Sequence, residues 1–165
     1  MKEILSNLIE ALREELKHYG EMLALLHQQQ QFVVQWQIVE LPDSAYSIRS
    51  QTGILAAARR ERERCQRHLA RLLAQPETSG FAVLIPRLPA DYRPLVDALV
   101  RENNELLVRV QQRAQLNQLL FRRCVELMQQ VINSVFPADS PATCDGAGLV
   151  PAAAVVPPLY QASAK

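Results

Sequence analysis

The sequence predicts an all-α protein, and three observations carry this prediction. Residues 1–136 are dominated by Leu, Ala, Gln, Arg and Glu, a composition that is typical of helices. Apolar residues recur there at steps of three and four, which is the spacing of one helix face. Two proline-containing segments, 41–44 and 75–91, divide the region into three long amphipathic stretches. We therefore expect an elongated, antiparallel three-helix bundle of the coiled-coil type, followed by a disordered C-terminal tail.

The first predicted helix covers residues 3–37, and Gly20 is its one weak position. The segment LPDS (41–44) ends the pattern, because Pro42 stops the helix and Asp43 or Ser44 can cap the next one. The carboxylates of Glu14 and Glu15 are expected to be ordinary exposed ones. The apolar face of this helix consists of Leu5, Leu8, Leu12, Leu16, Tyr19, Leu23, Leu26 and Val33.

The second predicted helix covers residues 44–74 and carries a strict heptad. Its arginine-rich run RRERERCQRHLAR (59–71) is interpreted as a solvated helix face with internal Glu–Arg pairs. Glutamates interrupt the run and no aromatic residue lies within it, so no nucleic acid partner is expected. The heptad positions are Ile48, Gln51, Leu55, Ala58, Arg62, Cys65, Leu69 and Leu72.

The connector 75–91 contains several prolines, which exclude a continuous helix, yet its segment FAVLI (81–85) is strongly apolar. We expect FAVLI to fold back over one end of the bundle. The third predicted helix, residues 91–136, carries two adjacent apolar stripes that together span roughly 200° of its circumference, wider than one surface helix usually needs. The stripes consist of Leu95, Leu99, Leu106, Val110, Leu120, Cys124, Leu127 and Val131, and of Val100, Leu107, Ala114, Phe121, Val125 and Ile132.

The third helix is predicted to be longer than the second by about 15 residues, or some 20 Å. Its C-terminal segment FRRCVELMQQVINSVF (121–136) would then extend past the other helices and offer an apolar surface to a partner helix. The alternative is that VVQWQIV (33–39) covers this surface, and both arrangements stay open. The predicted partner-binding residues are Val125, Leu127, Met128, Val131, Ile132, Val135 and Phe136.

Polar residues interrupt the third helix. On a helical wheel Asn104 points away from the apolar face, Asn103 lies at its border, and Asn117 falls inside it together with Arg113. One interpretation is that a buried asparagine fixes the register of the helices at a cost in stability. The other is that Arg113 extends into solvent and Asn117 faces water at a loosely packed place.

The sequence contains no catalytic or metal-binding constellation that we can identify. We find no HExxH, no glycine-rich phosphate loop, no GxSxG and no cysteine pair at metal spacing, so no enzyme activity, metal or cofactor is expected. Cys65 lies on an apolar face, which indicates a buried thiol. The three cysteines lack a CxxC motif, which favours a reducing compartment. No apolar run is long enough for a membrane span, and the N-terminus does not read as a secretory signal.

The domain prediction is a helical domain over residues 1–136 and a flexible tail, rich in Pro and Ala, over 137–165. No amphipathic period continues past Pro137. The tail contains a single aromatic residue, Tyr160.

Three segments resemble the FlgN-type flagellar chaperones: the N-terminal LIEALREELKHYGEMLALLHQQQ, the segment AARRERERC, and ENNELL with its Glu102, Asn104, Leu106 and Leu107. The resemblance covers roughly residues 4–135. The proline-rich connector FAVLIPRLPADYRP departs from it most.

The resemblance implies a cytoplasmic chaperone of the flagellar type III export system that binds the hook-associated proteins, which later form the hook–filament junction. Such a chaperone prevents premature assembly of its cargo and escorts it to the export gate. The resemblance places cargo contacts toward the C-terminal helix and makes Tyr160 a candidate for gate docking. The alternative function is a generic coiled-coil adaptor or self-assembling structural protein. A monomer, a dimer and a helix-swapped dimer all stay open.

Overall fold

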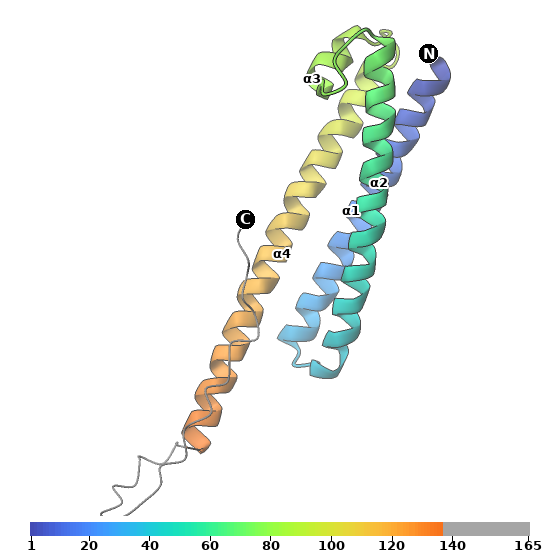
Figure 1. Ribbon diagram of the computed structural model, residues 1–165. Helices are drawn as coiled ribbons and strands as arrows, with labels where there is room; N and C mark the ends of the chain where they lie inside the picture. Colours follow the sequence, from blue (N-terminus) through green and yellow to red (C-terminus); the bar gives the residue numbers. More distant parts are fainter. Residues whose placement is uncertain (137–165) are drawn as a thin grey trace, which may run out of the picture. The chain divides into compact units, whose positions relative to one another are not determined.

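The computed structural model of the protein describes residues 1–136, and the predicted tail with Tyr160 lies outside this range. All regular structure in the described part is helical (Figure 1). No helix there is long and apolar enough to cross a membrane. The elements are α1 (Lys2–Val34), the 3₁₀ turn η1 (Ile38–Glu40), α2 (Leu41–Leu72), α3 (Phe81–Leu84), the 3₁₀ turn η2 (Ile85–Arg87) and α4 (Arg93–Val135).

The chain divides into two units, Met1–Met128 and Gln129–Lys165. The boundary falls inside the continuous helix α4, which begins at Arg93 and ends at Val135. The packing described below is that of the first unit. Of the second unit, the structure describes the last residues of α4 and Phe136.

The three long helices lie where the sequence predicts them, with one correction at the start of α2. Helix α2 begins at Leu41, so the segment LPDS belongs to its first turn and does not separate it from the preceding structure. Pro42 is tolerated there because the first N–H groups of a helix have no intrahelical acceptor to lose. The real break comes earlier, where α1 ends at Val34.

Both long helices of the N-terminal half end in the same backbone motif. After α1, Trp36 adopts a φ of 57°, and its N–H donates to the Val33 carbonyl while the Gln37 N–H donates to the Phe32 carbonyl. After α2, Ala74 adopts a φ of 51° and an equivalent pair of bonds forms. This is the Schellman ending, whose left-handed position is usually glycine because a Cβ there is unfavourable. The unfavourable conformation at Trp36 therefore needs a separate explanation.

The apolar core lies at the end of the first unit that carries the connector. Leu5, Leu8 and Leu12 of α1 pack there with Leu69 of α2 and with Val96 and Leu99 of α4. Leu88, which follows η2, is part of the same cluster, and Phe81 and Ile85 pack against it. The prediction that FAVLI folds back over one end is thus confirmed, and this segment forms α3 and the start of η2.

Helix α1 carries a heptad pattern along its whole length. Most of its buried positions alternate by three and four residues, as in a coiled coil, and Ile9 and Ala11 are buried beside them. Two of these positions, Glu15 and Gln29, are polar. The predicted apolar face of this helix contained Leu16 and Leu23 instead. Those two leucines are only half-buried. The buried series is Leu5, Leu8, Leu12, Glu15, Tyr19, Met22, Leu26, Gln29 and Val33.

Helix α4 lies parallel to α1 and in heptad register with it. The Asn103 side-chain amide donates to the Leu12 carbonyl at 3.0 Å, and the Asn117 amide donates to the Leu26 carbonyl at 2.7 Å. Both pairs are separated by 91 residues, and a constant separation requires parallel helices in one register. Each helical carbonyl keeps a second lone pair for such a bond. Asn117 is buried, as the register interpretation expects, and not facing water, and Asn103, expected at the border, is also buried.

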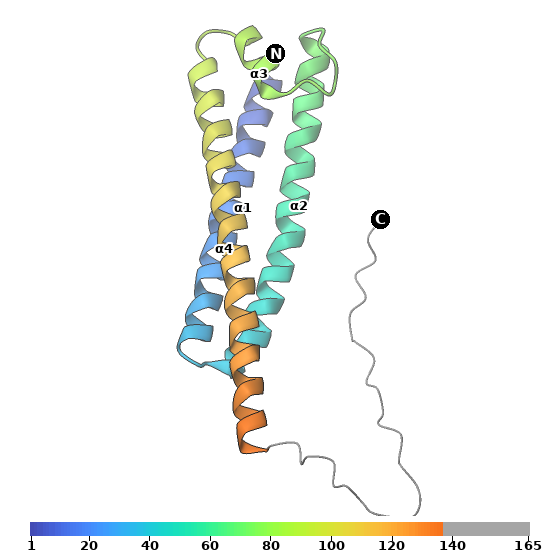
Figure 2. The ribbon, with the colours of Figure 1, turned by 90° about the vertical axis from the view of Figure 1, so that its left-hand side faces the viewer.

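The backbones of α1 and α2 approach each other closely along an antiparallel hairpin, whereas the backbone of α4 stays further from both (Figures 1 and 2). The all-helical class is therefore confirmed, and a short fourth helix, α3, accompanies the three long ones. Within the first unit, only the α1–α2 pair packs as closely as a regular bundle would. Beyond Leu99, α4 makes polar contacts through Asn103, Arg113, which bonds Gln30, and Asn117, and its heptad residues Leu106, Val110 and Leu120 are half-buried.

We predict that the double variant Asn103→Leu, Asn117→Leu keeps or gains stability but loses its single register. The side-chain oxygens of both asparagines are buried without a hydrogen-bond partner, and removing such atoms saves on the order of 1 kcal/mol each. Urea unfolding measures the stability. Distances between spin labels on α1 and α4 measure the register and should broaden in the variant. A distribution as narrow as in the wild type would show that apolar packing alone sets the register.

Candidate functional site

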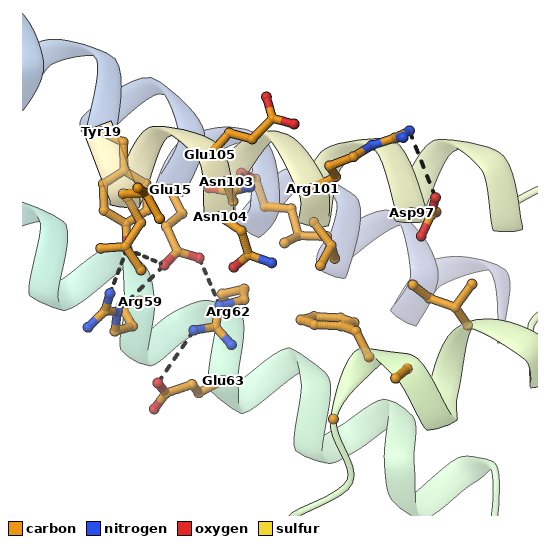
Figure 3. Close-up of a pocket in the computed structure, with 18 of the residues that line it drawn as sticks. Glu15, Tyr19, Arg59, Arg62, Glu63, Asp97, Arg101, Asn103, Asn104 and Glu105 are labelled. Carbon is orange, nitrogen blue, oxygen red and sulfur yellow. Dashed lines mark hydrogen bonds and ion pairs between the residues drawn. The ribbon is translucent and has the colours of Figure 1, made fainter. Parts of the chain in front are cut away.

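A groove of about 1070 Å³ lies in the first unit where α4 stands apart from α2 (Figure 3). Its floor includes Leu12 and Tyr19 of α1, and Phe81 of α3 closes one end. The α4 side contributes Val100 and Leu107, which are half-buried. The groove exists because α4 contacts α1 through widely spaced positions and leaves the flank of α2 uncovered.

A buried carboxylate lies on the floor of this groove. Glu15 is 3% exposed, although the sequence suggested an ordinary surface carboxylate. One of its oxygens accepts a hydrogen bond from Arg62 Nε at 2.8 Å, and the other lies 3.7 Å from Arg59 Nε. The Tyr19 hydroxyl donates to the same carboxylate at 3.3 Å and accepts from Arg59 at 2.6 Å. The prediction was wrong because Glu15 occupies a heptad position of α1 that faces α2.

The arginine-rich run of α2 is correspondingly more than a solvated face. Arg62 is half-buried and also donates to Gln66, whose side chain donates to the Ser79 carbonyl of the connector at 2.9 Å. Burial raises the pKa of Tyr19, against the opposing effect of the Arg59 hydrogen bond. The hydroxyl therefore remains a neutral donor. These bonds join α1, α2 and the connector through a hydrogen-bonded network whose carboxylate is satisfied without a ligand.

The groove is suited to apolar side chains and offers no reactive centre that we can identify. Most of its charged groups pair with one another, as Glu15 does with Arg62 at 2.8 Å and Asp97 with Arg101 at 3.9 Å. Cys65 is buried, as predicted, and burial raises the pKa of its thiol, which disfavours the reactive thiolate. Over residues 1–136 no three His, Cys, Asp or Glu side chains are grouped as metal ligands would be.

The predicted partner-binding residues of α4 are all exposed, with 39% to 74% of their surface accessible. For Leu127 and Val131 the heptad explains why. The buried α1 series ends at Val33, which the separation of 91 residues places level with Cys124. The next heptad position of α4 is Leu127, and no residue of α1 is left to cover it. The exposed residues are Val125, Leu127, Met128, Val131, Ile132, Val135 and Phe136.

The segment between α1 and α2 exposes a second apolar surface, which we call the turn surface. Residues 33–39 were predicted only as the alternative in which this segment packs over the apolar end of α4. In the structure the side chains of this segment after Val33 are exposed themselves, so they do not bury α4. The turn surface consists of Val34, Trp36, Ile38, Val39 and Tyr46, whose exposed fractions range from 51% to 85%.

Several predicted face positions were wrong, and for α4 a strict heptad could have identified the error. Leu95 and Leu72 are exposed, whereas Val96 is fully buried. Val96 follows from counting back from Asn117 and Asn103 in steps of four and three. Ala114, predicted on the second stripe of the third helix, is also exposed. No sequence pattern predicted the groove, because the groove depends on the distance between α4 and α2.

Comparison with protein families gives a match to the family described as FlgN protein, over residues 1–148. The match covers all of the described residues and extends into the predicted tail, but it does not reach Tyr160. No curated protein and no solved structure gives a match.

We predict that Glu15→Ala lowers the free energy of unfolding by about 2 kcal/mol, because it leaves Arg62 and Arg59 without their buried counter-charge. Partial exposure of the arginines keeps the loss below that of a fully buried pair. The matched control is Glu14→Ala, one residue away, whose carboxylate is half exposed and pairs with Lys17 at 3.8 Å. It should change stability by less than about 0.5 kcal/mol. Equal losses in urea unfolding would contradict the buried role of Glu15.

Proposed function

We propose a cargo-binding role for this chain, which belongs to the FlgN family of flagellar export chaperones. Its cargo would be the helical terminal segments of hook-associated proteins, held until they reach the flagellar type III export apparatus. The role is that of a cytoplasmic binding protein without turnover. The single observation that carries the proposal is the unpaired apolar face of α4 after Cys124.

The chemistry of this face fits a helical ligand. Its side chains are aliphatic, with one methionine and one phenylalanine, and they recur at helical spacing along one continuous helix. A cargo helix that adds its own apolar face continues the heptad pairing that α1 provides up to Val33. Burial of this surface contributes roughly 25 cal/mol per Å². The cost of ordering the cargo segment offsets part of the gain, which keeps the complex reversible.

Self-association of the same surface is the competing function, since an exposed apolar stripe can pair with a second copy. The two functions differ in what the free protein does. A chaperone leaves the surface available, so its mass stays that of a monomer or dimer over a wide concentration range. A self-assembling coiled-coil protein grows with concentration and retains no hook-associated protein.

We predict that Val131→Asp and Ile132→Asp each abolish retention of hook-associated proteins from the same genome in a co-purification experiment. Both side chains are more than half exposed, so helicity measured by circular dichroism should persist. A matched control is Leu119→Asp, on the same helix and 56% exposed, but turned by roughly 120° to 140° about the helix axis from Val131 and Ile132. A folded wild-type protein that retains none of these proteins would refute the proposed function.

The second part of the proposal assigns gate docking to the segment 137–165 and to its aromatic residue Tyr160. We predict that deletion of residues 137–165 leaves folding and cargo affinity unchanged while lowering export of the cargo. Tyr160→Ala should reproduce the export defect if the aromatic ring makes the contact. Full export by the deletion variant would place gate docking in residues 1–136.

A further inference from the structure

We infer that the turn surface is a second contact for the cargo helix, with Trp36 as its anchor. This inference rests on the proposed function and adds to it the other side of the binding site. The occupant is one amphipathic helix, whose apolar ridge meets α4 and whose neighbouring edge meets the turn. Two independent features of the turn surface support the inference: the conformation of Trp36 and the charge around it.

The position of Trp36 suits neither folding nor packing. Its φ of 57° is one that favours glycine, and 60% of its surface is exposed. The residue thus holds an unfavourable backbone conformation without burying its ring, which is the largest apolar side chain available to a protein. Ala74 holds the same backbone conformation, so the feature that distinguishes Trp36 is its large apolar ring left exposed, which is typical of a binding position. Tryptophan is also the residue most enriched among those that dominate binding energy.

The register places the turn surface beside the unpaired face of α4 within the first unit. Adding 91 to 34 brings Val34, the last residue of α1, level with Val125, and Trp36 follows two residues later in the turn. Leu127 is the first heptad position of α4 without a partner on α1, and it is 53% exposed. A cargo helix that packs on the side of Leu127 that faces the line of α1 therefore also contacts the turn, because α1 ends at Val34.

The charge of the turn surface specifies the chemistry of its partner. Between Val34 and Ile48 the sequence has two acidic residues, Glu40 and Asp43, and no Lys, Arg or His. Both side chains are exposed, and neither takes part in an ion pair within the described residues. Both also stand at the N-terminal turn of α2, which tolerates negative charge. The cargo helix is thus expected to carry Lys or Arg on the edge that faces the turn.

The test compares two glycine variants of the full-length chain. Trp36→Gly and Ala74→Gly both place glycine at the left-handed position of a Schellman ending, so neither should lower the melting temperature. Only Trp36→Gly removes the anchor. We expect it to weaken binding of purified hook-associated protein by roughly tenfold or more in titration calorimetry, whereas Ala74→Gly should bind as the wild type does. Glu40→Lys with Asp43→Lys should weaken binding as well.

A second measurement uses the wild-type chain alone, so it does not depend on any variant folding. Trp36 is the one tryptophan of the sequence, and it reports directly on the turn surface. With cargo whose tryptophans are replaced by phenylalanine, binding should shift the emission to shorter wavelength and protect Trp36 from iodide quenching.

Unchanged emission together with wild-type affinity of Trp36→Gly would overturn the inference and leave the proposed function standing. A wild-type chain that binds no hook-associated protein would overturn both.

Discussion

The in-register pairing of α1 and α4 is the constraint on which the other features depend. Two asparagine amides, 14 residues apart along α4, donate to α1 carbonyls that are also 14 residues apart, as the common separation of 91 requires. Fourteen residues are two heptads, so the bonds recur on the same face of both helices. This pairing fixes which residue of α4 lies level with the end of α1. It thereby determines where the apolar face of α4 loses its partner.

The same pairing explains the groove. Because α4 is held to α1 by polar bonds at spaced positions, its backbone does not settle against α2, and Val100 and Leu107 remain half-buried. The α1–α2 hairpin does not need α4 at that level, since Glu15, Arg59 and Arg62 connect the two helices directly. Apolar burial is concentrated at the end where Leu88 and Val96 join the core. Core packing therefore stabilises the connector end of the first unit, whereas the exposed apolar residues of the turn surface lie away from that core.

Periodicity in the sequence was sufficient to predict the three long helices and the exposure of the end of α4. The apolar steps of three and four located all three long helices, because helix formation depends on local pattern and on the prolines that interrupt it. The predicted partner-binding residues followed from the lengths of the helices. The burial of polar heptad residues was harder to predict. Glu15 is buried because Arg62 of α2 bonds its carboxylate, and Asn103 is buried because its amide bonds a carbonyl of α1. The apolar composition of the turn surface is evident in the sequence, but its exposure follows from the end of α1 at Val34.

The distribution of burial along α4 has a consequence for how a ligand could leave. Its four buried residues are Val96, Leu99, Asn103 and Asn117, all in its first two thirds. Amide hydrogen exchange should therefore be slowest near Val96 and fastest after Cys124, since local opening costs least where few buried contacts are lost. A helix bound to the last third can dissociate through fraying of that segment while the hairpin stays folded. In the proposed cargo complex, release would then follow a local opening and would need no global unfolding of the protein.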